Sequence, residues 1–161
     1  MPDRAKPVKV KVNLPHPALP QADWADCYRL HIAERGVMAI DAARRTLGHF
    51  PPWVRALMTV RNAAVGLFGL KTSHHAMGSV ETIGFFPVIS KSPGQVVLGF
   101  DDRHLDFRVV IDVQDDATGE SVSVTTLVWR KITLGRLYIA VITPFHNLIV
   151  YSMLASLGGR A

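Results

Sequence analysis

TLGRLYIAVITPFHNLIVYSMLASLGG, residues 133–159, is the stretch of sequence that decides the fold. When it is wound into a helix, apolar side chains occupy almost the whole circumference, and only Arg136, Thr143 and Asn147 share a narrow polar stripe. A helix that is apolar on most sides must be covered by another part of the chain. The stretch therefore predicts a long C-terminal helix that the rest of the molecule embraces.

The ends and the middle of this helix carry further information. Thr133 suits the N-cap position and two glycines follow the last turn, so we expect the helix to cover residues 134–157. The segment is about long enough to cross a bilayer. However, Pro144, His146 and Asn147 lie near its centre, where polar groups are costly in lipid. We therefore predict a core helix, bent near Pro144, and no transmembrane segment.

The partner that could embrace this helix lies just before it, where the hydrophobic pattern changes from helical spacing to alternation. Residues 104–113 alternate between apolar and mostly polar types, which predicts a strand with one core face. Further strands are expected over residues 81–89, 95–100 and 121–131, with Pro87 marking an edge or a bulge. Short turns between successive strands imply an antiparallel meander. The expected core face of residues 104–113 consists of Leu105, Phe107, Val109, Ile111 and Val113.

The N-terminal half supplies one more strand and two shorter helices. Residues 26–33 alternate, which predicts a half-buried strand. Helices are predicted over residues 38–49 and 53–70, because two prolines between them end the first and open the second. We expect residues 1–16 to be a flexible tail and residues 17–161 to form a single α+β domain, an antiparallel sheet wrapped around the long C-terminal helix. The two faces of the first strand are Cys27, Arg29 and His31 against Tyr28, Leu30 and Ile32.

Composition and charge narrow the class of protein. The chain has 161 residues, enough for one domain with a sizeable core, and a formal net charge of +5. Beyond an N-terminal cluster, its basic residues are dispersed among acidic ones, so we predict no nucleic-acid binding. Cys27 is the only cysteine, which excludes an intrachain disulfide and suits a reducing compartment. The first residues do not resemble a secretory signal, and we expect a cytoplasmic protein.

Three phrases of the sequence resemble a bacterial family of unknown function. They are PPWVRALMTVRNAAVGLFGLK at residues 51–71, VVLGFDDRHLDFRV at 96–109 and LGRLYIAVITPFHNLIVYSML at 134–154. That family is similar to the START and birch-pollen-allergen-like superfamily (SRPBCC), so the resemblance, over residues 17–157, implies a helix-grip fold with two shorter helices after the first strand. Relatives are sometimes fused to NAD-binding short-chain-dehydrogenase-like domains, but this chain has no G-x-G-x-x-G after a strand.

Arg61 is the sharpest anomaly among the candidate site residues. On its predicted helix it projects about a third of a turn away from the polar stripe, among apolar residues. A charge on an apolar face must be paired, reach outward or meet a ligand. Arg61 could therefore bind a carboxylate or phosphate head group, or it could form an ion pair. The acids available for such a pair include Asp101, Asp102 and Asp106.

His104, Asp106 and Arg108 point to one face of a predicted strand. A histidine beside a carboxylate could perform acid–base chemistry, and an arginine could hold an anionic group. The opposite face of this strand is the expected core face. We therefore favour the alternative that these three side chains face solvent or a subunit contact.

The C-terminal helix and the residues before it offer aromatic candidates. Tyr138 and Phe145 lie on a stripe that could line a pocket between helix and sheet, although such stripes more often form core. Trp129 is a further aromatic candidate, and His146 is interpreted as a satisfied core or surface histidine. Two adjacent histidines in a loop lack the spacing of a zinc site, and neither a phosphate loop nor a nucleophile elbow is present. We predict no metal, no cofactor and no assigned catalytic residue.

Three functions are compatible with these residues. The first is binding of a small hydrophobic or amphipathic ligand, apolar or with an anionic head, in a cavity between sheet and C-terminal helix. The second, which the superfamily resemblance implies, is a cyclase-, dehydratase- or hydrolase-like enzyme using the same cavity. The third is a ligand-free accessory partner of a dehydrogenase-like protein, and a homodimer is compatible with all three. The candidate ligand-binding residues are Arg61, His104, Asp106, Arg108, Trp129, Tyr138 and Phe145.

Overall fold

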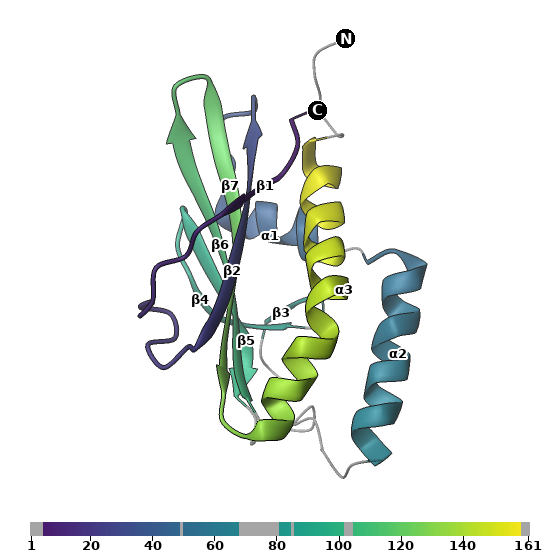
Figure 1. Cartoon of the computed structure of the whole chain (residues 1–161). Coiled ribbons are helices and arrows are strands. Elements are labelled where there is room, and N and C mark those ends of the chain that lie inside the picture. The colour runs from purple at the N-terminus through teal and green to yellow at the C-terminus, as the bar shows by residue number, and fades with distance from the viewer. Residues whose placement is uncertain (1–4, 49, 68–80, 85, 102–104, 159–161) are drawn as a thin grey trace.

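The computed structural model describes residues 5–48, 50–67, 81–84, 86–101 and 105–158, and the side chains at 57–58, 61–62 and 64–67 lie outside that description. Within these ranges, seven strands form one antiparallel sheet that three helices accompany (Figure 1). The strands are β1 (Val8–Val10), β2 (Trp24–Ile32), β3 (Thr82–Ile83), β4 (Phe86–Lys91), β5 (Gln95–Asp101), β6 (Leu105–Asp116) and β7 (Gly119–Arg130). The helices are α1 (Ala39–Leu47), α2 (Pro52–Leu67) and α3 (Thr133–Gly158).

The order of strands across the sheet is β1-β2-β7-β6-β5-β4-β3. β6 and β7 form a long hairpin whose register runs from Asp116 opposite Gly119 to Leu105 opposite Arg130. β2 then pairs along the other side of β7. The predicted meander is confirmed for β4 to β7, and the N-terminal strand joins it beside the last strand. β7 is therefore an interior strand, and its two neighbours, β2 and β6, lie far apart in the sequence.

The single strand expected over residues 81–89 is wrong in detail, because two strands are present there. Gly84 has a φ of +61°, a left-handed conformation that favours glycine, and it turns the chain between β3 and β4. Pro87 lies in β4, and the register shifts between Val88 and Ser90. The bulge that Pro87 suggested is thus confirmed.

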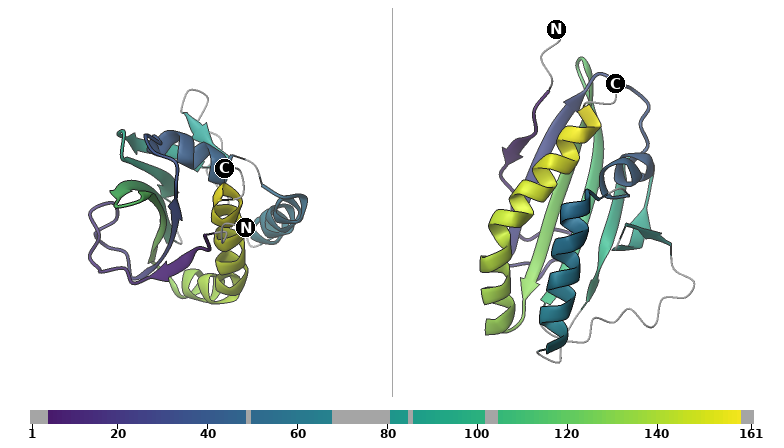
Figure 2. Two further views of the ribbon diagram at one scale, coloured as in Figure 1. Left: turned by 90° about the horizontal axis from the view of Figure 1, so that it is seen from above. Right: turned by 90° about the vertical axis from the view of Figure 1, so that its right-hand side faces the viewer.

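One face of the sheet, called the inner face below, packs against helices. α3 lies against β2 and β7, and α1 lies against β5 and β6 (Figure 2). The predicted core face of β6 is confirmed, because Val109 and Ile111 are buried in this layer and Phe107 packs at its border. Each fully buried side chain of this size contributes roughly 1.5–3 kcal/mol to folding. The inner layer is therefore the main core of the molecule.

The C-terminal helix differs from the expectation that it would be covered on most sides. Leu154 and Leu157 are buried against the sheet, whereas Leu137, Val141 and Leu148 are each more than half exposed. The reason is geometric, since the sheet reaches one face of α3 and α2 stands beside it (Figure 1). By length and composition, α3 is also apolar enough to span a membrane, a test that a core helix can pass as well.

The opposite face of the sheet, called the outer face, is partly covered by the N-terminal segment. Leu19 and Ala22 pack there in a second apolar cluster. A flexible tail is expected over residues 1–16, but Val8–Val10 pairs with β2 as an edge strand. The domain boundary at residue 17 stays a prediction, although the chain before it contributes to the sheet. The sheet residues of this outer cluster are Val97, Val110 and Leu127, with Ala25 and Trp129 partly buried beside them.

The predicted fold class is confirmed at the level of architecture. The protein is α+β, with a seven-stranded antiparallel sheet and a long C-terminal helix, and both shorter helices follow the strand β2. This arrangement is compatible with a helix-grip fold. The loop expected over residues 71–79 lies outside the described residues.

Candidate functional site

The candidate ligand-binding residues fall on both sides of the sheet. Tyr138 packs at the border of a small inner cluster of Leu105, Val128 and Ile139. Phe145 is half exposed on α3. Trp129 belongs to the outer cluster, on the opposite side of the sheet from these two. The three aromatic candidates therefore do not line one common pocket.

The acidic and basic candidates of β6 lie on the face opposite the predicted core face, but the expectation that they meet solvent is wrong for Asp106. Asp106 is buried, and the ammonium of Lys131 lies 2.6 Å from its carboxylate and 5.0 Å from the Trp129 ring centre. Arg108 donates to the Asp101 carboxylate at 2.7 Å. Both side chains are thus engaged in ion pairs. His104 and the side chain of Arg61 lie outside the described residues.

A buried acid–histidine pair lies under α3 on the inner face, and we call it the inner pair. Asp26, from β2, is 5% exposed, and one of its carboxylate oxygens lies 3.2 Å from Nε2 of His146 on α3. The Trp24 ring meets the His146 ring edge-on, with 5.7 Å between centres. Alternation along β2 directs Asp26 to the same face as Tyr28 and Leu30, and therefore toward the helix.

Three buried, unpartnered polar atoms belong to the inner pair or to residues next to it in register or in sequence. Thr126 lies directly opposite Asp26 in the β2–β7 register. Among the described residues, no partner accepts or donates to Asp26 Oδ2, Thr126 Oγ1 or Asn147 Oδ1, and all three atoms are buried. Burial, reinforced by the Asp26 charge, raises the pKa of the nearby Tyr28 hydroxyl. Buried polar atoms are usually satisfied, so such a cluster is typical of a site that receives a polar group.

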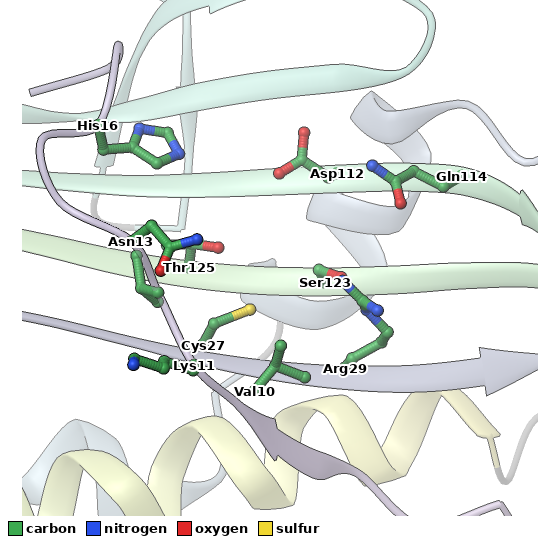
Figure 3. A pocket seen from close by; sticks show the side chains of 11 residues that line it. Val10, Lys11, Asn13, His16, Cys27, Arg29, Asp112, Gln114, Ser123 and Thr125 are labelled. Carbon is green, nitrogen blue, oxygen red and sulfur yellow. The ribbon is translucent and has the colours of Figure 1, made fainter.

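A second site, called the outer cleft, opens on the other face of the sheet (Figure 3). It has a volume of about 250 Å³ and lies between the N-terminal segment and strands β2, β7 and β6. Cys27, Thr125 and Ser123 line it from β2 and β7, and Asp112 from β6. Val10, Val12, Lys11, Asn13, His16, Arg29 and Gln114 complete its lining.

The polar side chains of the outer cleft form a row across the sheet. Arg29 pairs in register with Ser123, which in turn pairs with Asp112. Nε of Arg29 donates to the Ser123 hydroxyl at 3.1 Å. Asp112 accepts from the side-chain amide of Gln95 at 2.9 Å. A cation and an anion therefore stand on either side of a hydroxyl group, two strand spacings apart.

Cys27 and His16 complete the chemistry of the outer cleft. Burial raises the pKa of the Cys27 thiol above its ordinary value, and the Thr125 and Arg29 side chains only partly oppose this effect. The thiol is therefore protonated at neutral pH and is a poor nucleophile. Nδ1 of His16 accepts the backbone N–H of Ala18 at 3.1 Å, so a neutral ring carries its proton on Nε2.

Sequence reasoning missed both sites, although part of the signal was present. Extending the alternation of β2 back to Asp26 places a carboxylate on its apolar face, an anomaly of the same kind as Arg61. His146 was interpreted as a satisfied histidine, and its contact with Asp26 was not expected. For the outer cleft, alternation predicted that Cys27 and Arg29 share a face. It could not predict that β7 lies beside them.

Comparison with known proteins identifies the chain at the level of its family. A family model described as "Protein of unknown function (DUF2867)" matches residues 18–153. No match is found among curated proteins, and none among solved structures. The match spans most of the chain, from the segment that covers the outer face to Met153 in the buried part of α3. The chain therefore belongs to the DUF2867 family of proteins of unknown function.

Proposed function

We propose that the protein binds a small amphipathic molecule between the sheet and α3, with the polar end of that molecule at the inner pair. The observation that carries the proposal is the buried Asp26–His146 contact with unpartnered polar atoms beside it. A ligand group that donates to Asp26 Oδ2 would satisfy an atom whose burial is otherwise costly. The resemblance to helix-grip proteins supports the same location.

The residues of the inner pair also suggest what the polar end should be. An anionic head group would meet the Asp26 carboxylate, and like charges in a buried site repel strongly. A hydroxyl or amide group can instead donate to Asp26 Oδ2 or Asn147 Oδ1 and can accept from the Thr126 hydroxyl. We therefore favour a ligand with an apolar body and a neutral, hydrogen-bonding end. An anionic end would depend on Arg61.

The intrinsic fluorescence of Trp24 can test this proposal. In a protein with Trp53→Phe and Trp129→Phe, titration with 1-decanol should change the Trp24 emission in a saturable way. Asp26→Ala should weaken that response about tenfold or more, because the receiving carboxylate is gone. Asp41→Ala, at an exposed position of α1, is the matched control and should respond normally. No saturable response to decanol, or an unchanged response in Asp26→Ala, would contradict the proposal.

A second candidate function is general acid–base catalysis on the bound molecule. It is favoured by the 3.2 Å contact between His146 and Asp26, because a carboxylate that orients an imidazole is a common acid–base arrangement. Mass spectrometry of a ligand recovered after incubation separates the two functions. Catalysis predicts a changed mass or isomer that disappears in His146→Gln, whereas simple binding returns the ligand unaltered.

A further inference from the structure

We propose that the outer cleft is a second binding site, for a small carboxylate that also carries an ammonium or hydroxyl donor. The cleft lies on the opposite face of the sheet from the inner pair, so the proposal does not depend on the function proposed above. Its volume of about 250 Å³ is just below the roughly 300–1,000 Å³ of sites for drug-sized ligands, which points to a metabolite-sized molecule.

Arg29 supplies the end that would hold the carboxylate. Its Nε is engaged by Ser123, which fixes the plane of the guanidinium. Its two terminal nitrogens have no partner among the described residues, and they present two parallel N–H donors. Figure 3 shows the Arg29 side chain lying along Ser123 at the edge of the cleft. A planar carboxylate is the group that matches such a fork.

Asp112 supplies the opposite end. Gln95 donates to Oδ1 of its carboxylate, and Oδ2 remains able to accept. Asp112 stands two strand spacings from Arg29, which is about 10 Å between the backbones, and both residues line the cleft. A molecule with a carboxylate at one end and a donor a few bonds away would span the two. A simple carboxylate would offer no donor to Asp112 Oδ2.

The groups between and above these ends suit the same molecule. Ser123 and Thr125 contribute hydroxyl groups from β7, and His16, whose Nδ1 accepts from Ala18, offers a donor on Nε2. The lining carries two positive charges, Lys11 and Arg29, and one negative charge, Asp112, so the cleft as a whole attracts an anion. The protonated Cys27 thiol offers a small, weakly polar surface and no competing charge.

Four three-carbon or smaller probes separate the parts of this proposal. L-Serine and L-lactate carry both a carboxylate and a donor, propionate carries the carboxylate alone, and ethanolamine carries donors alone. L-Serine or L-lactate should bind at least about tenfold more tightly than propionate or ethanolamine, a difference of about 1.4 kcal/mol. The affinities are read from the shifts of the Cys27, Ser123 and Thr125 signals in amide NMR spectra of the whole chain.

Variants then assign the two ends. Arg29→Gln should weaken the binding of L-serine and L-lactate at least about tenfold. Asp112→Asn should weaken the binding of L-serine more than the binding of L-lactate, because the ammonium of L-serine needs the negative charge of Asp112. Arg35→Gln is the matched control, because Arg35 is exposed and, among the described residues, bonds only backbone carbonyls at the β6–β7 turn. The proposal is overturned if no probe shifts these signals up to about 20 mM, if propionate binds as well as L-lactate, or if Arg29→Gln binds normally.

Discussion

At the scale of single residues, burial decides what the polar side chains of this protein can do. Arg108 and Asp106 carry the charges that drew attention in the sequence, yet each is held in an ion pair. Asp26 and Cys27 are neighbours in sequence on opposite faces of β2, and both are buried. Asp26 is a carboxylate whose second oxygen has no partner among the described residues, and Cys27 is a thiol that stays protonated at neutral pH.

The raised pKa of Cys27 predicts how stability depends on alkaline pH. The folded state holds the thiol proton more tightly than the unfolded state, so this contribution is complete below the ordinary thiol pKa. It is lost as the pH rises through the folded-state pKa. Urea unfolding at a series of pH values from neutral to alkaline should show a steeper loss for the native chain than for Cys27→Ala.

The same residue should react slowly with alkylating reagents at neutral pH, because thiolate is scarce and the sulfur is buried. Iodoacetamide labelling, followed by mass spectrometry, should accelerate once urea unfolds the chain. Rapid labelling of the folded protein at neutral pH would contradict the protonated, buried thiol.

At the scale of elements, α3 differs from what its sequence suggests, whereas the β6–β7 hairpin follows its sequence. α3 looks apolar all round, but the sheet covers a single face of it. The hairpin ends in an acidic turn, where Asp116 accepts from the Ala117 backbone N–H at 2.6 Å. The coverage of α3 depends on contacts between distant segments, whereas the turn contact joins two neighbouring residues.

The two faces of α3 predict losses of stability of different size for the same type of substitution, leucine to alanine. Leu154→Ala removes a fully buried side chain and should cost about 2–5 kcal/mol of unfolding free energy. Leu137→Ala, on the exposed face of the same helix, should change it by no more than about 0.5 kcal/mol. Urea unfolding measures both. A large loss for Leu137→Ala would mean that another surface covers this face.

The hairpin turn predicts a dependence on acid. The Ala117 backbone N–H, then the Ser121 hydroxyl, hold the pKa of Asp116 below its ordinary value. The stabilisation is therefore complete above the ordinary aspartate pKa and is lost as the pH falls through the folded-state pKa. Asp116→Asn should lower the melting temperature at pH 7, and the difference from the native chain should shrink in strong acid. Asp115→Asn is the neighbouring control.

The sequence predicts these elements unevenly for physical reasons. The core face of β6 was predictable because alternation is a property of one strand. The break at Gly84 was not, since residues 81–89 are apolar enough for one continuous strand. The inner pair and the outer cleft depend on β2 lying beside β7 and under α3, which is a matter of register and packing between distant segments.

At the scale of the whole molecule, the sheet separates two different environments. Its inner face carries the main core and the inner pair, and its outer face carries the outer cleft beside a smaller apolar cluster. The N-terminal segment is the only described covering of that outer cluster from outside the sheet. One strand, β2, contributes residues to both sites through alternate side chains.

This separation predicts the effect of shortening the chain. Deleting residues 1–16 removes β1 and Val12, and it uncovers part of the outer cluster. The melting temperature should fall by several degrees, as expected for a loss of about 1 kcal/mol or more in a chain of this size. Deleting residues 1–4 alone is the control. A flexible tail over residues 1–16 would make both deletions silent.

The position of β7 between β2 and β6 has a consequence for the order in which the sheet can assemble. β2 leaves the ribosome early, but its long partner follows only after residue 118. Until then, β2 presents an unpaired edge that carries apolar side chains, and such edges pair with other chains. Nascent fragments that stop before β7 should therefore need a chaperone to remain soluble. Fragments that end at residue 118, before β7, and at residue 132, after β7, can be released from stalled ribosomes and compared by sedimentation. The shorter fragment should aggregate without a chaperone, and the longer one should aggregate less.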